Sequence, residues 1–254
     1  MRRCLIHAFF ITIAFSACTY ATENKTIIYA IPHWPPWSDT SEYPYQGIDV
    51  DVVNALANKI AVDVETVQCA WKRCLRLLET GKADIATNVL KRASRERYLY
   101  YLSPPYRTNL IYAFYTHKGS MISIKHQSDL YSYSVSLERG ASFTSDFDND
   151  SNITKRPVSQ IDFAIKQLIN QRASVVIGES HQIDYMVAKF DQNDVLEKQP
   201  LTYSEALESY IVLSKTSSNS HLKKQLTDAL KQLVASGEIT EIIDNHSRKA
   251  TRTD

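Results

Sequence analysis

Short strand-like runs alternate with helix-like segments near the start of the chain, and this alternation restricts the fold more than any other feature. The expected strands are residues 26–31, 62–67 and 84–89. Between the first two strands, apolar residues recur at every fourth position, as on one face of a helix; these are Ile48, Val52, Leu56 and Ile60. A second helix ends at Gly81, a usual C-terminal cap. This order predicts a parallel sheet flanked by helices.

A similar order recurs in the second half of the chain. Strands are expected over residues 134–137 and 173–177, with a helix between them. The apolar face of that helix consists of Ile161, Ile165, Leu168 and Ile169. Two more strand-like segments, residues 110–116 and 210–214, are expected to carry the chain to the second unit and back. Two crossings predict a two-stranded hinge, with a ligand cleft between two α/β lobes.

The first 21 residues have the pattern of a secretory signal peptide. A basic start is followed by a thirteen-residue apolar run, residues 5–17, which is too short to span a bilayer. Cleavage is expected after Ala21, and a lipid anchor on Cys18 remains open because residues 15–18 are similar to a bacterial lipobox. The expected division is then residues 1–21 as signal peptide, 26–109 as lobe 1, 110–208 as lobe 2 with a hinge strand, and 209–248 as the return strand and C-terminal helices of lobe 1.

The charge of the chain points to neither nucleic acid nor an anionic membrane as a partner. The formal net charge is +1, and loss of Arg2 and Arg3 with the signal peptide changes it to −1. Both kinds of partner favour clustered basic charge.

Cys69 and Cys74 are the cysteines that remain after signal-peptide removal. An exported protein meets an oxidising compartment, so a disulfide between them is expected, and two unpaired buried thiols are the alternative. No His pair is spaced to complete a zinc site with them, and no metal is expected.

Six short segments occur in the order typical of one protein family. They are residues 34–37 (WPPW), 47–51 (GIDVD), 77–84 (LLETGKAD), 103–106 (SPPY), 139–142 (RGAS) and 176–180 (VIGES). Together they resemble the bacterial extracellular solute-binding proteins of family 3, the periplasmic receptors of polar amino-acid ABC transporters. The resemblance covers nearly all of residues 26–246. It implies a type II periplasmic binding protein fold, with two parallel or mixed sheets flanked by helices.

The resemblance also implies that one arginine after the strand 84–89 holds the carboxylate of the ligand. A guanidinium suits this role because its planar fork binds both oxygens. An ungapped count places Glu96 in the arginine position, with Arg95 and Arg97 on either side. A shift of one residue would bring either arginine into the cleft, and Arg97 is preferred. The alternative is that Arg92, Arg95 and Arg97 all lie on a solvated helix start.

Four other residues are candidate ligand contacts by the same resemblance. Glu179 lies where the family has an Asp that receives the amino group of the ligand, although a Glu that caps the next helix is the alternative. Trp34 matches a position that stacks on the ligand. Trp37 would extend that aromatic wall, with core packing as the favoured alternative. Ser142 and the amides near Gly140 would bind an anion if a helix began there.

The sequence therefore predicts a periplasmic, monomeric solute-binding protein without cofactor that captures a small polar, amino-acid-like ligand. Its expected partner is a membrane ABC permease or a sensor protein. A dehydratase-like enzyme on the same scaffold and a sensory module without transport remain alternatives. No Gly-x-Ser-x-Gly, phosphate-loop or His-Glu-x-x-His motif supports an enzyme. Two substitutions put a standard amino acid in doubt, because Val89-Leu90-Lys91 and Ile31 stand where the family has polar ligand contacts.

Overall fold

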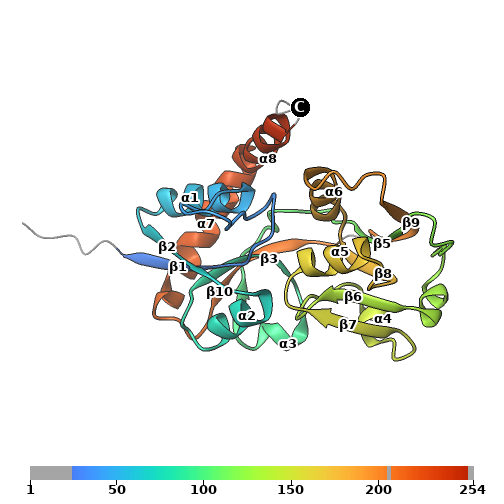
Figure 1. Ribbon diagram of the computed structural model, residues 1–254. Helices are drawn as coiled ribbons and strands as arrows, with labels where there is room; N and C mark the ends of the chain where they lie inside the picture. Colours follow the sequence, from blue (N-terminus) through green and yellow to red (C-terminus); the bar gives the residue numbers. More distant parts are fainter. Residues whose placement is uncertain (1–24, 205–206, 251–254) are drawn as a thin grey trace, which may run out of the picture.

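The computed structural model describes residues 25–204 and 207–250, with side chains placed up to residue 246. Two lobes lie side by side, each built around one five-stranded sheet (Figure 1). The predicted signal peptide and the lipid-anchor site at Cys18 lie outside the described residues. Among the helices that are described, none is long and apolar enough to cross a bilayer.

The sheet of lobe 1 has the order β2-β1-β3-β10-β4, in which β10 runs antiparallel to the other four strands. The strands are β1 (Thr26–Ile31), β2 (Asp63–Gln68), β3 (Ile85–Leu90), β4 (Leu99–Tyr101) and β10 (Ser209–Ser214). Helices α1 (Ile48–Lys59) and α7 (Lys223–Ala235) cover one face, and α2 (Trp71–Glu79) covers the other (Figure 1). The remaining helical elements are α3 (Ala93–Glu96), η2 (Ser218–Leu222) and α8 (Glu238–Ala250).

The sheet of lobe 2 has the order β7-β6-β8-β5-β9. Its strands are β5 (Tyr112–His117), β6 (Ser134–Glu138), β7 (Thr154–Val158), β8 (Val175–Glu179) and β9 (Leu196–Tyr203). The helical elements are η1 (Gln127–Ser132), α4 (Ser145–Asn149), α5 (Ile161–Ile169) and α6 (Ser180–Lys189). Strand β6 runs parallel to β7 and β8, so the carboxyl ends of these three strands meet at one edge.

The apolar faces expected from the sequence form the cores. In α1, Val52 and Leu56 are fully buried against α7, whereas Ile60 lies just beyond the last turn of α1 and is only partly buried. In α5, Ile165 and Leu168 are buried against the sheet of lobe 2. Helical periodicity is a local property, which is why the sequence identified these faces correctly.

The chain crosses between the lobes just before the two segments expected to do so. Strand β5 belongs to the sheet of lobe 2, and β10 belongs to the sheet of lobe 1. The crossing segments pair with each other at Arg107 and Ser209, where the Ser209 amide donates to the Arg107 carbonyl at 2.9 Å. The Leu110 amide likewise donates to the Leu207 carbonyl at 3.3 Å. Main-chain pairing thus holds the two hinge segments together.

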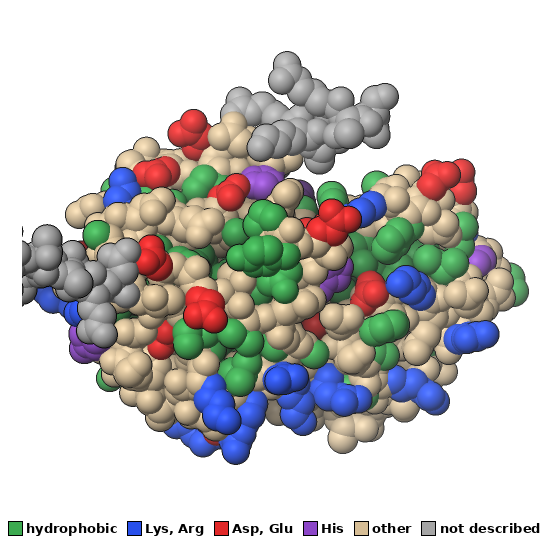
Figure 2. Space-filling view, turned by 60° about the vertical axis from the view of Figure 1, so that its left-hand side comes forward, with side chains coloured by type: hydrophobic (Ala, Val, Ile, Leu, Met, Phe, Trp, Pro, Cys, Tyr) green, Lys and Arg blue, Asp and Glu red, His purple; other side chains and the backbone are tan. Residues whose placement is uncertain are grey.

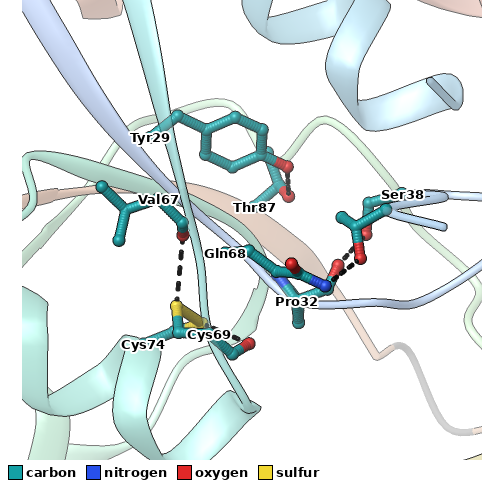
Figure 3. Close-up of a disulfide and its surroundings, with 9 residues drawn as sticks. Tyr29, Pro32, Ser38, Val67, Gln68, Cys69, Cys74 and Thr87 are labelled. Atoms are coloured by element: carbon teal, nitrogen blue, oxygen red, sulfur yellow. Dashed lines mark hydrogen bonds between the residues drawn. A yellow bond between two sulfur atoms is a disulfide. The ribbon is translucent and has the colours of Figure 1, made fainter. Parts of the chain in front are cut away.

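A disulfide joins Cys69 and Cys74 across the entrance of α2 (Figure 3). Cys69 follows the last residue of β2, and Cys74 is buried in α2. The bond therefore fixes α2 to the carboxyl end of β2. Trp71, which lies between the two cysteines and begins α2, donates a hydrogen bond to the Gly140 carbonyl of lobe 2.

Charges of both signs are spread over the surface. Figure 2 shows Lys and Arg side chains along the lower edge of one face, with Asp and Glu side chains above them. Within the part of the chain that is described, no group of three or more His, Cys, Asp and Glu residues is arranged to hold a metal ion.

Candidate functional site

A cavity of about 60 Å³ lies between the two lobes. From lobe 1 it is lined by Thr87 and Asn88 of β3, and from lobe 2 by Glu138 at the end of β6 and Glu179 at the end of β8. The carboxyl ends of parallel strands are the usual ligand site of open α/β sheets. One water needs about 10–15 Å³, so the cavity has room for roughly four to six waters or one compact solute.

Arg95 places a buried positive charge in this cavity. Its side chain, in α3, is 7% exposed. It donates to the Leu90 carbonyl at 3.3 Å and, across the cleft, to the Gly140 carbonyl at 2.8 Å and Ser142 Oγ at 3.1 Å. Burial lowers the pKa of Arg95, yet a guanidinium stays protonated at neutral pH. No carboxylate of the described residues forms an ion pair with Arg95, so its positive charge in the cavity is not balanced by a neighbouring negative charge.

Arg97, the arginine that the sequence favours, lies outside the cavity, and Arg95 lies inside it instead. Its side chain is 68% exposed and forms an ion pair with Glu79 on the outer surface. Successive residues of a helix are rotated by about 100°, so Arg95 and Arg97 point to nearly opposite sides of the single turn of α3. Glu96, which occupies the arginine position in the ungapped count, pairs with Lys91 at 3.3 Å, and its side chain is also largely exposed.

Glu179 lies in the cavity wall, but its carboxylate already has partners. Oε2 accepts a hydrogen bond from the Gln182 amide at 2.9 Å, so the residue caps α6, and another from Trp37 Nε1 at 3.3 Å. Oε1 pairs with Arg107 Nη2 at 3.4 Å. Both the cavity position and the helix cap proposed from the sequence therefore apply. The charge of Glu179 is balanced by Arg107, a residue that was not among the predicted contacts.

The two tryptophans expected to form a wall are separated by the structure. Trp34 lines the cavity. Trp37 is 3% exposed and packs in the core of lobe 1, with the Arg107 guanidinium carbon 3.3 Å from its ring centroid. Trp37 is absent from the cavity lining, so its contact with the site runs through Glu179. Trp71, and not Trp37, lines the cavity together with Trp34. Trp71 Nε1 donates a hydrogen bond to the Gly140 carbonyl at 3.1 Å.

A buried polar network that the sequence did not reveal supports the hinge side of the cavity. Asp49 accepts hydrogen bonds from the Tyr106 hydroxyl at 2.9 Å, Thr87 Oγ1 at 2.9 Å and Asn88 Nδ2 at 2.5 Å. Arg107 Nη1 donates to Asn88 Oδ1. Burial raises the pKa of Asp49 to about 6. The network joins the first turn of α1, strand β3 and the first hinge segment.

The conformation of Asn88 explains why the sequence did not predict this polar network. Its φ of 56° lies in the left-handed region, within β3 beside an irregularity in the pairing with β10. Strained or bulged strand residues often redirect side chains at functional sites. Asn tolerates this conformation better than most residues. A lone Asn in an apolar strand was the only available signal, and nothing in it indicates a bulge.

Glu138 is a second cavity carboxyl that the sequence did not single out. It is the last residue of β6, and its side chain forms no hydrogen bond or ion pair with any described residue. Burial, and then the negative charge of Asp162, raise the pKa of Glu138 to about 8. At neutral pH this carboxyl is therefore mostly protonated in the empty cavity. Its position directly before the Arg139-Gly140 turn is a signal that could have drawn attention to it.

Comparison with known proteins agrees with this geometry. The sequence pattern of the family described as "Bacterial extracellular solute-binding proteins, family 3" matches residues 27–249. The chain belongs to this family. It is similar to the amino-acid-binding protein AabA of Dichelobacter nodosus, with 24% identity over 197 residues that cover 76% of each protein. The family and the two-lobed fold predicted from the sequence are thereby confirmed.

Two solved structures illustrate the fold of this solute-binding protein. A mutant of ArgBP from T. maritima superposes with a TM-score of 0.77 at 20% identity, over 88% of this chain and 95% of that one. An ancestral arginine-binding protein bound to arginine superposes with a TM-score of 0.75 at 22% identity, over 87% of this chain and 98% of that one. At such identities the likeness shows the fold alone, and the ligand must be argued from the cavity.

The lobes of this family 3 protein touch around the cavity. Lys189 of lobe 2 pairs with Asp39 of lobe 1 at 3.4 Å, and Arg92 of lobe 1 donates to the Phe143 carbonyl of lobe 2. Arg95 also binds acceptors in lobe 2. A solute in the cavity would thus contact both lobes and would be largely removed from water.

Proposed function

We propose that the mature protein captures a small amino-acid-like solute between its lobes and presents it to an ABC-type permease in the membrane. Family membership and the similarity to a protein named for amino-acid binding support this role. The observation that carries the proposal is Arg95, a buried guanidinium in the interlobe cavity whose described partners are all neutral oxygens. A ligand carboxylate supplies the missing negative charge.

The position of Arg95 couples binding to closure. Its guanidinium, from lobe 1, reaches Ser142 and Gly140 in lobe 2. A carboxylate bound there contacts both lobes only when they are closed, so the solute binds the closed form better than the open form. Charged hydrogen bonds are also stronger in a partly dry cavity than at a surface. Trp34 and Trp71 supply apolar walls for the rest of the ligand.

We further propose that the protein acts in the periplasm, as a monomer, and binds its solute without converting it. The extracellular location of the family and the solute-binding relatives support this assignment. Delivery requires reversible binding, and the groups in the cavity serve recognition: a guanidinium, hydroxyls, amides and carboxyls. A turnover assay with each bound solute tests this part of the proposal, since product formation would contradict it.

The central test is calorimetric titration of residues 22–254 with the twenty L-amino acids. A ligand at 100 times its dissociation constant adds about 2.7 kcal/mol of stability, so a thermal-shift screen can select the candidates first. Arg95→Ala is expected to weaken binding at least 100-fold. Arg97→Ala is the matched control and is expected to bind normally, because its side chain is exposed outside the cavity. Unchanged binding by Arg95→Ala would overturn the carboxylate site.

A further inference from the structure

The cavity contains two acidic side chains in very different states. Glu179 has a full set of partners, namely Arg107, Trp37 and the amide at the start of α6. Glu138 lines the same cavity from the end of β6 and has no hydrogen bond or ion pair with any residue that the structure describes. A carboxyl that is partly removed from water and has no partner loses hydration without gaining a hydrogen bond, and Glu138 is such a partly buried group. Glu138 is thus the acidic group with free acceptor capacity.

A contact between Glu179 and the ligand would disrupt the existing ion pair between Glu179 and Arg107. A ligand ammonium on Oε1 would compete with Arg107, whose guanidinium also binds Asn88 and stacks on Trp37. Loss of that pair would leave the buried Arg107 guanidinium with Asp49 as its remaining acidic neighbour and would break a buried ion pair, which is unfavourable. The hinge arginine therefore removes Glu179 from the set of free cation sites.

We propose that Glu138, rather than Glu179, receives the cationic group of the solute, and that the cavity selects solutes with one anionic group, one cationic group and no net charge. This inference rests on the proposed function. Arg95 and Glu138 provide one positive and one negative site, whereas Arg107 and Glu179 neutralise each other. A third charge on the solute would be buried without a partner, at a large cost in desolvation.

Gln182 provides independent support for a polar contact on the lobe 2 side of the cavity. It is 1% exposed, it lines the cavity from the first turn of α6, and its Nε2 has no hydrogen-bond partner. A buried donor without a partner is rare in folded proteins. A solute could accept a hydrogen bond from Gln182 Nε2 through a polar group and pair with Glu138 through its cationic group. Both side chains would then have a partner.

Proton release gives this inference a signature of its own. Around Glu138, the charged groups are Asp162 of α5, which is 3.4 Å from Lys166 Nζ, and Arg95 across the cavity. Because the pKa of Glu138 is raised to about 8, the carboxyl is mostly protonated at pH 7 before binding. When a ligand ammonium pairs with it, the carboxyl ionises, and its proton passes to the buffer. Titrations in buffers of different ionisation enthalpy measure that proton.

The experiment compares the wild-type protein, Glu138→Gln and the surface control Glu96→Gln. Each is titrated with net-neutral L-amino acids, with L-arginine and L-glutamate, and with propionate as the analogue of L-alanine that lacks the amino group. For the wild type, we expect net-neutral amino acids to bind most tightly and to release close to one proton. Glu138→Gln is expected to lose at least 20-fold in affinity for them and to release none, whereas Glu96→Gln should match the wild type.

The outcomes separate this inference from the function on which it rests. If Arg95→Ala abolishes binding while Glu138→Gln leaves affinity and proton release unchanged, the binding function stands and the Glu138 contact is overturned. Tighter binding of L-arginine or L-glutamate than of any net-neutral amino acid would overturn the charge selection. If none of the twenty amino acids binds the wild type, the proposed function fails, and this inference fails with it. Equal binding of propionate and L-alanine would also contradict a cation contact.

Discussion

The hinge and the cavity each contain a buried arginine, and the two differ in what surrounds them. Arg107 at the hinge pairs with Glu179, donates to Asn88 and lies over the ring of Trp37. Arg95 in the cavity donates hydrogen bonds only to carbonyl and hydroxyl oxygens of the described residues. The same side chain is thus saturated in one place and incomplete in the other. A buried charge whose partners are supplied by the fold serves the structure, and one whose partner is missing indicates a ligand.

The largest expected effect separates the two arginines by stability. Arg107→Ala leaves Glu179 buried without its counter-charge, and breaking a buried pair in this way costs about 3–5 kcal/mol. Urea denaturation without ligand should show this loss. Arg95→Ala should show none, because it removes a buried charge that has no acidic partner. Equal destabilisation by both substitutions would abolish the distinction between the two sites.

The second effect separates them by affinity. Arg95→Ala should weaken the best amino acid of the panel at least 100-fold, which corresponds to about 2.7 kcal/mol. Calorimetry measures the affinity, and circular dichroism confirms that the variant is folded. Arg97→Ala, which changes an exposed arginine two residues away, should bind like the wild type.

The third effect concerns the covalent support on the Arg95 side of the cavity. The Cys69–Cys74 bond positions α2, which bears Trp71 beside Arg95, with the guanidinium carbon 5.9 Å from the ring centroid. The double change Cys69→Ala, Cys74→Ala should cost about 2 kcal/mol of unfolding free energy, as expected for a short closed loop. Denaturation with and without a reducing agent measures it. A wild type whose stability does not respond to reduction would contradict the prediction.

The smallest effect is the pH dependence caused by Glu138. Its folded pKa of about 8 lies above the usual 4.5, so the folded state binds this proton more tightly than the unfolded state. The associated stability is complete below about pH 4.5 and is lost as the pH rises to about 8. Glu138→Gln removes this loss and should be more stable than the wild type at pH 8.5 by roughly 1–2 kcal/mol, with partial exposure to the cavity taken into account.

That difference should nearly vanish at pH 3.5, where Glu138 is mostly protonated in both the folded and the unfolded state. Urea midpoints of the wild type and Glu138→Gln at the two pH values test it. Asp49, whose pKa is raised to about 6, titrates in both proteins and cancels in the comparison. A difference that is the same at both pH values would show that Glu138 ionises normally in the empty cavity.

Local patterns predicted most of the fold. The apolar spacing of α1 and α5 identified their buried faces, and the order of strands and helices identified two lobes. The sequence placed the two crossings within β5 and β10, a few residues after their true positions. Strand composition shows that a segment is a strand, but it does not show whether the strand lies within one lobe or runs between two. Of the predicted contacts, Trp34, Arg95, Ser142 and Glu179 meet in the cavity.

The sequence by itself determined the α/β order, the two lobes and the family, because each depends on periodicity and motif order along the chain. Only the tertiary structure decided which arginine enters the cavity, since a shift of one residue in α3 turns a side chain by about 100°. It also decided that Glu179 is neutralised by Arg107 and that Glu138 stands unpaired. Those partners lie far apart in the chain, and charge balance in a closed cavity depends on which groups the fold brings together.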